Sequence, residues 1–173
     1  MTTNLNAVLN LPPLSSIRRN HALEHATLHV LVERQRRRWL AGHSGTQGFW
    51  IIGEVATDDL ESAAQEALQR LRNGEASLAV HPNCGTNFAT AGLLAGGFAA
   101  LAMLGSGRRL RDQFERLPLA ITLGMLGLVA AQPLGMLLQE TVTTSAIPGT
   151  LEIVAVLPKT LGSLPTHRVL TRF

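Results

Sequence analysis

Apolar and polar residues follow helical spacing in the first part of the chain. From about residue 17 to residue 39, apolar positions recur at helical intervals and nearly surround the middle of the segment. This pattern predicts a buried helix, which Ser15 or Ser16 can cap. Because buried imidazoles need partners, the histidines of this helix must bind a metal ion or form hydrogen bonds. Residues 1–14, polar and then Pro-rich, are expected to form a flexible lead-in.

Two short β-rich segments flank a second amphipathic helix. Residues 49–55 (FWIIGEV) and 76–80 (ASLAV) are bounded by turn residues and predict strands, whereas residues 41–48 (AGHSGTQG) predict a loop. Between the strands, apolar residues at helical spacing predict a helix over 57–72, capped by Thr57 and with acidic residues in its first turn. Strand, helix and strand at this spacing predict a βαβ unit with a right-handed crossover.

Two long apolar runs dominate the second half of the chain. Residues 88–105 and residues 117–138 contain no charged side chain, and each run is long enough to cross a bilayer. The alternative is a pair of central helices in a soluble fold, but the short Arg-rich link between the runs favours a transmembrane hairpin. Gly92 and Gly96 have the spacing of close helix contacts, and Gly124 and Leu128 repeat that spacing with only one small residue.

A last β-rich segment, residues 150–156 (TLEIVAV), predicts a strand that can join the sheet of the first domain. The expected fold class is an α+β membrane protein with a small α-β-α-β domain, a two-helix transmembrane hairpin and a short C-terminal strand. The corresponding divisions are 1–14 for the lead-in, 15–87 for the α/β domain, 88–140 for the hairpin and 141–173 for the segment that returns to the first domain.

Composition adds a basic character without a nucleic-acid signature. The chain has 173 residues, a formal net charge of +3 and one cysteine. Its basic residues are arginines apart from Lys159, and several lie next to apolar runs, which favours contact with a lipid surface and no nucleic-acid partner. One cysteine excludes an intrachain disulfide, and residues 1–14 lack the pattern of a secretory signal peptide.

The residues that indicate chemistry begin with H-x-x-E-H at His21, Glu24 and His25. On a helix, residues four apart lie one above the other, so His21 and His25 can hold one metal ion with Glu24 beside it. Zn²⁺ accepts neutral imidazole ligands and leaves a position for water, and a nearby carboxylate can act as general base. His29 continues the same stripe. Zn²⁺ is the expected cofactor, and the alternative is a buried helix whose histidines are only hydrogen-bonded.

A third ligand is expected from the polar turn after the second predicted strand. His81 is the first candidate and Cys84, three residues later, is another, since dense polar turns at the ends of buried strands often hold site residues. In the same turn, Asn83 and Asn87 are candidates for stabilising an oxyanion. The alternative is an ordinary turn before a helix, with Cys84 as a small apolar filler.

More distant candidates come from the rest of the chain. Glu140 is a candidate ligand because a hairpin returns the chain to the same membrane surface. His167 can also return to the site, although a lone histidine near the C-terminus is usually exposed. His43, in the predicted loop, is expected to be exposed and to have no role.

Two resemblances follow from these motifs. H-x-x-E-H resembles the signature of the inverzincin metallopeptidases, which implies two zinc-binding histidines, a glutamate base and a downstream glutamate ligand. The nearest glutamates here, Glu54, Glu66 and Glu75, each have a plainer place on a strand or helix surface. The combination of NHALEHAT, GFWIIGEV and HPNCGTN before two apolar runs resembles an uncharacterised family of small bacterial membrane proteins. That resemblance covers most of the chain and implies no established activity.

These observations support competing functional hypotheses. The first is a membrane-embedded zinc hydrolase, most simply a metallopeptidase acting near the bilayer, with His21, His25 and His81 as ligands and Glu24 as base. The second is a non-enzymatic metal-binding subunit or accessory protein of a larger membrane complex, with a closed site of four protein ligands. The third is an interaction protein without a metal ion. The expected partners are the bilayer, a peptide or protein substrate if the chain is an enzyme, and further copies or subunits.

The orientation in the membrane follows from the charges. The resemblance implies a bacterial plasma membrane, which the two apolar runs would cross. Positive-inside counting of the Arg-rich link argues for a cytoplasmic link, whereas the Arg-rich first domain and the absence of a signal-peptide pattern argue for a cytoplasmic N-terminal domain. We expect the cytoplasmic N-terminal domain.

Overall fold

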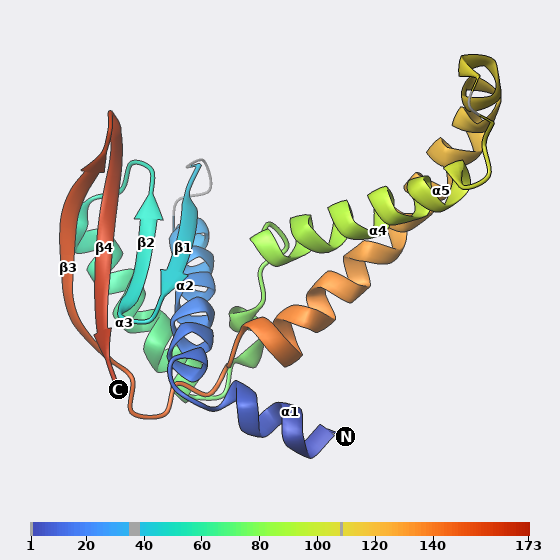
Figure 1. Cartoon of the computed structure of the whole chain (residues 1–173). Helices are drawn as coiled ribbons and strands as arrows, with labels where there is room; N and C mark the ends of the chain where they lie inside the picture. The colour runs from blue at the N-terminus through green and yellow to red at the C-terminus, as the bar shows by residue number, and fades with distance from the viewer. Residues whose placement is uncertain (1, 35–38, 108) are drawn as a thin grey trace. The chain divides into compact units, whose positions relative to one another are not determined.

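The computed structural model describes residues 2–34, 39–107 and 109–173, and its chain divides into two compact units (Figure 1). The first unit combines residues 1–81 with residues 139–173, and the second unit is the segment Pro82–Leu138 between them. The chain therefore leaves the first unit, forms the second, and returns to complete the first.

The first unit is built around helix α2, Leu14–Arg34, which a short helix α1, Thr2–Leu9, precedes. The predicted flexible lead-in thus contains a helix. The predicted C-terminal end of the long helix falls partly on residues 35–38, which lie outside the described residues. The middle of α2, from Ala22 to Leu28, is buried at every position, as its apolar residues on several faces predict.

Four antiparallel strands form one sheet in the spatial order β1-β2-β4-β3. The strands are β1 (Ala41–Gly45), β2 (Gly48–Ile52), β3 (Glu152–Leu161) and β4 (Leu164–Arg172). β2 lies in the middle, with β1 on one side and the C-terminal strand β4 on the other. The predicted strand near residues 150–156 is confirmed as β3 and joins the first sheet. β4 was not predicted.

The predicted βαβ unit is wrong. Residues Ala76–Ala79 form a short 3-10 helix, η1, and not a strand, so no parallel pair follows the helix α3, Thr57–Arg72. The predicted loop at 41–48 instead contains β1, which β2 pairs across a tight turn between Gly45 and Gly48. Both errors have one cause, because strand formation depends on a pairing partner and composition alone does not reveal one. Thr57 is not a cap, since Ala56 holds that position.

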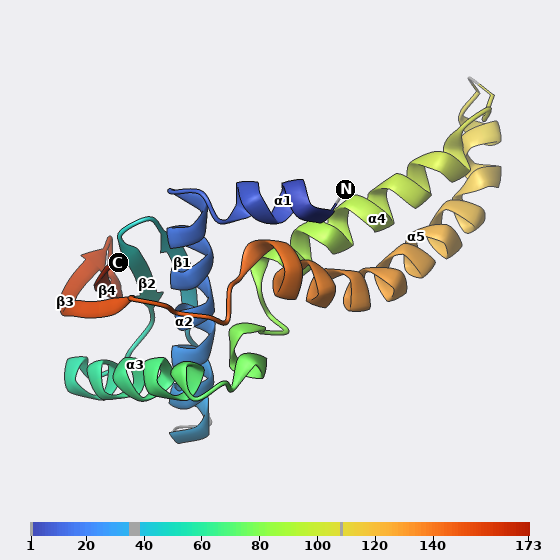
Figure 2. The same ribbon diagram turned by 90° about the horizontal axis from the view of Figure 1, so that it is seen from below.

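Helices α2 and α3 cover one face of this sheet, as the two views show (Figures 1 and 2). Their apolar faces and the inward side chains of the strands form a single core. Fully buried members of the core include Leu23, Ala26, Val30, Phe49, Ile51, Leu60, Ala67, Leu151 and Val169. The opposite helix surfaces carry ion pairs, for example Arg70 with Glu33 at 2.8 Å, which stabilise little because they are exposed.

Polar side chains of α2 join the returning C-terminal segment to the first unit. The guanidinium of Arg18 donates to the carbonyl oxygens of Val142 (2.7 Å) and Thr144 (2.9 Å) at the end of the π-helix η2, Gln139–Thr143. Fully buried Asn20 donates to the carbonyl of Gly45 (2.8 Å) and accepts from the hydroxyl of Thr171 (2.7 Å). One residue of α2 thereby ties β1 to β4.

The second unit consists of helices α4, Gly85–Met103, and α5, Leu110–Leu138, which run side by side in both views. Both predicted apolar runs lie in these helices, which are long and apolar enough to cross a membrane. Many large apolar side chains of this unit are exposed: Phe88, Leu93, Leu101, Phe114, Ile121, Met125 and Val129. Few of the apolar side chains on these two helices are therefore buried within the described structure.

Of the three predicted glycines only Gly124 lies against α4, and Gly127, which was not predicted, makes the closest approach. A Cβ atom at Gly127 would approach the carbonyl oxygen of Leu94 to 2.7 Å and the Cα of Ala95 to 2.9 Å. Gly124 lies beside Ala95 and Ala99, but Gly92 and Gly96 have no atom within 4 Å of a Cβ position. The contact between the helices therefore uses small residues of α5, as expected of close helix pairs.

Substitution of Gly127 by alanine is expected to destabilise the helix pair, whereas Gly92→Ala is expected to leave it unchanged or stabilise it. Alanine favours an isolated helix over glycine by about 1 kcal/mol, so destabilisation at Gly127 would report the steric contact with Leu94 and not helix propensity. The measurement is the thermal unfolding midpoint of each full-length variant in detergent. Equal midpoints for the two variants would show that Gly127 is not a packing contact.

Candidate metal centre

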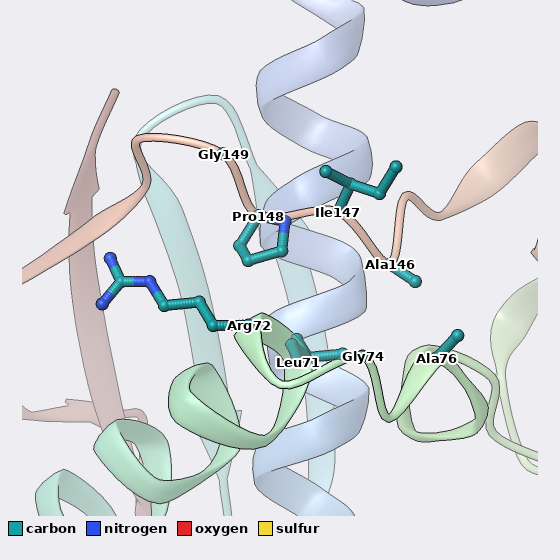
Figure 3. A pocket seen from close by; sticks show the side chains of 8 residues that line it. All are labelled: Leu71, Arg72, Gly74, Ala76, Ala146, Ile147, Pro148 and Gly149. Carbon is teal, nitrogen blue, oxygen red and sulfur yellow. The ribbon is translucent and has the colours of Figure 1, made fainter.

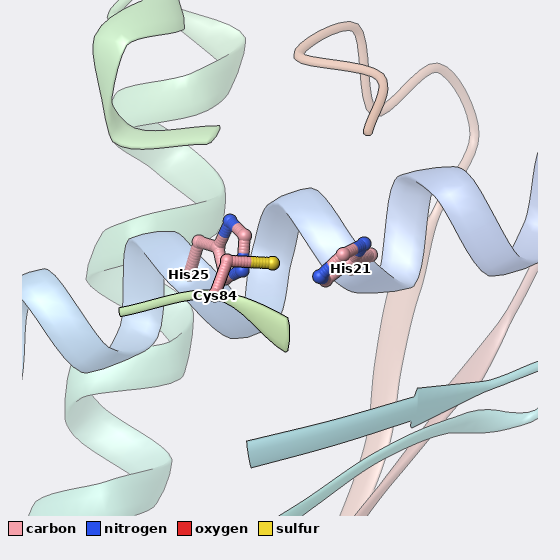
Figure 4. Close-up of side chains that lie close together, drawn as sticks. All are labelled: His21, His25 and Cys84. Carbon is pink, nitrogen blue, oxygen red and sulfur yellow. The ribbon is translucent and has the colours of Figure 1, made fainter. Parts of the chain in front are cut away.

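Three histidines lie one turn apart along α2, at His21, His25 and His29. The ring centroids of His21 and His25 are 4.3 Å apart, and their ligand nitrogens lie within 4.8 Å of one another. Figure 4 shows these two rings on successive turns of the helix, and it also draws Cys84. The helical spacing of the sequence motif therefore does bring His21 and His25 together, as predicted.

Backbone carbonyl groups orient both of these rings. The Nδ1 atom of His21 lies 3.0 Å from the carbonyl oxygen of Thr143, and the Nδ1 atom of His25 lies 2.8 Å from that of Ala79. A carbonyl oxygen only accepts hydrogen bonds, so each Nδ1 carries the proton and each Nε2 carries the lone pair. This is the arrangement in which metal-ligating histidines are usually held.

His81 brings a fourth imidazole to the same cluster. Its ring centroid lies 5.7 Å from that of His25 and 4.9 Å from that of His29. The backbone N–H of His81 donates to the side-chain oxygen of Gln139 (2.9 Å), which is completely buried. His29 is held by the carbonyl oxygen of Val80, 2.9 Å from its Nε2.

The surroundings of His81 favour its neutral form. Burial, together with the charges of the nearby His29 and His25, lowers the pKa of His81 to about 4. A neutral imidazole is the form that binds a metal ion. The predicted choice of His81 as a partner of the helix histidines is therefore consistent with the geometry of the first unit.

Glu24 points toward strand β1. Its carboxylate accepts a hydrogen bond from the hydroxyl of Ser44, and its side chain is only 4% exposed. A Cβ atom at Gly42 would overlap the same carboxylate, so this position of the strand needs glycine. Burial raises the pKa of Glu24, while the Ser44 hydrogen bond and the neighbouring His21 and His43 act in the opposite direction.

Three further predicted site residues belong to the second unit. Cys84 belongs to the second unit, where it caps α4 and its sulfur accepts from the N–H of Thr86 at 3.5 Å. In the same unit, the Asn87 amide donates to the carbonyl of Pro82 (2.7 Å), and Asn83 is exposed. These local contacts agree with the alternative of an ordinary turn before a helix.

The two candidates from the C-terminal part have different surroundings. Glu140 is exposed on η2, and its neighbour Gln139 is the buried residue that binds the His81 backbone. His167 is buried on β4, with its Nε2 atom 3.1 Å from the hydroxyl of Thr57, and burial lowers its pKa. Its expected exposure is therefore wrong. His43 is exposed on β1, as predicted.

The hollow that Figure 3 shows in the first unit contains none of these residues. It has a volume of about 510 Å³ and is lined by Leu71, Arg72, Gly74, Ala76, Ala146, Ile147, Pro148 and Gly149. Its one charged side chain, Arg72, donates to the carbonyl of Leu151 at 2.9 Å. This lining contains no histidine, cysteine or carboxylate side chain, so the hollow does not compete with the histidine cluster as a candidate metal site.

Sequence reasoning missed Gly42, Ser44 and Gln139. Gly42 and Ser44 lie in the segment predicted as a loop, and no spacing relates them to Glu24. Gln139 lies beside the predicted candidate Glu140, but no sequence pattern singles it out. Each is brought to the site by the pairing or return of distant segments, which a local pattern does not encode.

The lowered pKa of His81 predicts that the metal-free protein loses stability as the pH falls from 6.5 toward 4. In that range the unfolded chain binds a proton at His81 and the folded chain does not, so the free energy of unfolding falls with pH. Glu24 has the opposite effect, because a raised pKa stabilises the folded protein at lower pH. We therefore expect His81→Gln to reduce the loss of stability on acidification, measured by denaturation at several pH values with a chelator present.

The exposed His43 provides the matched control for this experiment. His43→Gln is expected to change the dependence of stability on pH less than His81→Gln does, because His43 is exposed and affects the titration of Glu24 only through its charge. A His81→Gln protein with the same acid dependence as wild type would contradict the environment described for His81.

Comparisons with known proteins agree with one of the two resemblances. No solved structure matches the chain. An uncharacterised protein of Picosynechococcus sp. is 43% identical over 108 residues, which cover 57% of this chain and 53% of that protein, so the chain spans about half the length of this relative. A domain of unknown function, DUF6391, matches residues 16–156, a segment that contains all four clustered histidines and Glu24. The chain belongs to the DUF6391 family.

Proposed function

We propose that this protein is a membrane-embedded zinc-dependent hydrolase, most simply a metallopeptidase that acts near the bilayer surface. One observation supports the metal site above the rest: His21 and His25 lie one turn apart, and a backbone carbonyl holds the Nδ1 atom of each. The tautomers of both rings are defined, and their Nε2 atoms lie on one face of the helix. This arrangement suits a tetrahedral metal site with nitrogen ligands.

His81 is the proposed third ligand, because it lies in the same cluster and is held neutral by its surroundings. His29 is the next candidate from the first unit. Cys84, three residues after His81 in the chain, stays a candidate from the sequence. Zinc is a common divalent cation in proteins, has no redox chemistry and binds well to imidazole nitrogens, so these ligands favour zinc. When bound, zinc would supply Lewis acidity toward water and toward a carbonyl group.

Glu24 is the proposed general base. A buried carboxyl group whose pKa is raised is better matched to accepting a proton near neutral pH than an exposed one. The hydrogen bond from Ser44 would hold one carboxylate oxygen in place, and the carboxylate would accept the proton from the attacking water. Positioned bases of this kind contribute about 10²–10⁴ in rate.

A second candidate is a non-enzymatic metal-binding membrane subunit. It is favoured by the direction of Glu24, which is bound to Ser44 on β1, and by the presence of four imidazoles in one cluster. Four protein ligands would close the coordination sphere and leave no position for water.

The bilayer is the proposed partner of the second unit. Its two helices are long and apolar enough to cross a membrane, and few of their residues are buried within the structure. We propose a bacterial plasma membrane, a cytoplasmic first unit and a peptide or protein substrate, with assembly into an oligomer or a larger complex. No feature of the chain suggests nucleic acid as a partner.

Zinc content and hydrolysis together test the proposal. Purified full-length protein is expected to hold about one zinc ion per chain, and His21→Ala or His25→Ala should remove it, because ligand loss typically weakens metal binding severely. Glu24→Gln should keep the zinc ion but lower peptide cleavage by at least about 10²-fold, since glutamine has nearly the same shape and cannot accept the proton. The measurements are metal analysis by mass spectrometry and cleavage of casein or peptides.

The exposed His43 again serves as control for metal binding, since His43→Ala should keep the zinc ion. Zinc in the wild type without any cleavage, together with loss of zinc in Glu24→Gln, would support the metal-binding subunit. Full zinc occupancy in the His21→Ala/His25→Ala double variant would disprove the site.

Removal of the second unit tests the membrane assignment. Because the backbone of His81 contacts the side chain of Gln139, the two ends of the first unit can be joined by a short Gly-Ser linker in place of Pro82–Leu138. We expect the full-length protein to require detergent and to co-sediment with membranes, and the shortened protein to lose both properties. A full-length protein that is monomeric without detergent would contradict the assignment. Truncation after Asn87 is not an equivalent test, because it removes β3 and β4 from the sheet.

A further inference from the structure

Strand β1 is an edge of the sheet, and half of its backbone groups face outward. It pairs with β2 through a two-residue turn in which Gly45 lies opposite Gly48. The two residues that flank such a turn form both backbone hydrogen bonds with each other. Along the two strands, these hydrogen-bonded pairs alternate with pairs whose N–H and C=O groups point away from the partner strand. The N–H and C=O groups of Gly42 and Ser44 therefore point away from β2. In the described part of the chain, no hydrogen bond reaches these four groups.

The other edge, β3, is protected against further pairing. β3 pairs with β4 through a turn that Leu161 and Leu164 flank, so the same alternation applies. The backbone groups of Pro158 and Thr160 therefore point away from β4. Proline has no N–H to offer to an additional strand, and Lys159 beside it adds a charge, which are two common protections of edge strands. β1 has neither proline nor a charged lysine or arginine. One edge of the sheet is thus protected and the other is open.

The open edge also lies at the candidate site. The side chain of Ser44 donates to Glu24, while the backbone of Ser44 faces outward along the sheet. Gly42 lies against the same carboxylate. A strand added beside β1 would thus run past the residue proposed as general base.

We propose that the outward edge of β1 binds an extended peptide segment as an additional strand. Gly42 and Ser44 supply two donors and two acceptors to its backbone, so binding depends on the peptide main chain and tolerates many side chains. This inference deepens the proposed peptidase function, on which it rests for the identity of the peptide as substrate. The binding itself requires neither zinc nor cleavage.

The experiment measures amide hydrogen exchange of zinc-free, full-length protein in detergent, resolved at single residues. The probe is a library of random octapeptides with blocked termini, added in excess. We expect slower exchange at Gly42 and Ser44 when the library is present. A matched library in which alternate amides are N-methylated should give no protection, since those peptides cannot form the ladder of hydrogen bonds.

Two protein variants separate the edge backbone from the Ser44 side chain. Ser44→Pro removes an outward N–H and should weaken peptide binding about fivefold, the effect of one main-chain hydrogen bond. Ser44→Ala keeps that N–H, loses the hydroxyl and should bind as wild type does. Thr160→Pro makes the equivalent change on the protected edge and should also bind normally.

The outcomes distinguish this inference from the proposed function. Protection by peptides without any hydrolysis supports the edge and contradicts the hydrolase, whereas cleavage without protection at Gly42 and Ser44 overturns the edge. Protection that rises with protein concentration in the absence of peptide would identify a second copy as the occupant and would also overturn it. Equal protection by the N-methylated library would show that main-chain pairing is not the mode of binding.

Discussion

The need of buried polar groups on α2 for hydrogen-bond partners organises the first unit. Asn20, Glu24, His25 and Thr27 are each almost completely buried on this one helix. A buried polar group left without a partner costs roughly 1–3 kcal/mol, a large part of the stability of a small domain. Thr27 bonds within its own helix, at the carbonyl of Leu23, but the other three bond to different elements. α2 can therefore be buried only when those elements surround it.

These partners come from four different elements of the unit. Asn20 contacts β1 and β4, Glu24 contacts β1, and His25 contacts the carbonyl of Ala79 at the end of η1. His21, half-buried, contacts η2. The helix thus selects the arrangement of the segments around it by the geometry of hydrogen bonds, while the apolar core supplies most of the favourable free energy. Because the hydrogen bonds determine the arrangement and the apolar core supplies the free energy, a small sheet with two short strands is held in one arrangement.

The same hydrogen bonds prepare the histidine cluster for chemistry. A carbonyl oxygen on Nδ1 determines the tautomer and leaves the lone pair of His21 and His25 on Nε2. Burial keeps His81 neutral, and its backbone is anchored by Gln139 where the chain returns from the second unit. Structure and candidate function are therefore coupled, because the contacts that bury α2 are the contacts that orient its histidines.

Periodicity by itself determined the long helices, because helical hydrogen bonds and apolar stripes are local to a segment. It located α2, α3 and the two apolar helices, and it placed His21 and His25 on one face. Only the tertiary structure decided the sheet, since β1 is rich in glycine and becomes a strand by pairing with β2, and β4 pairs with β2 more than a hundred residues later. It likewise decided that His81 joins the cluster, that Glu24 turns to Ser44, and that Gly127 and not Gly92 lies at the contact of the apolar helices. Those contacts depend on which distant segments meet. The pattern of apolar and polar residues within one segment does not identify the distant segment that it will contact.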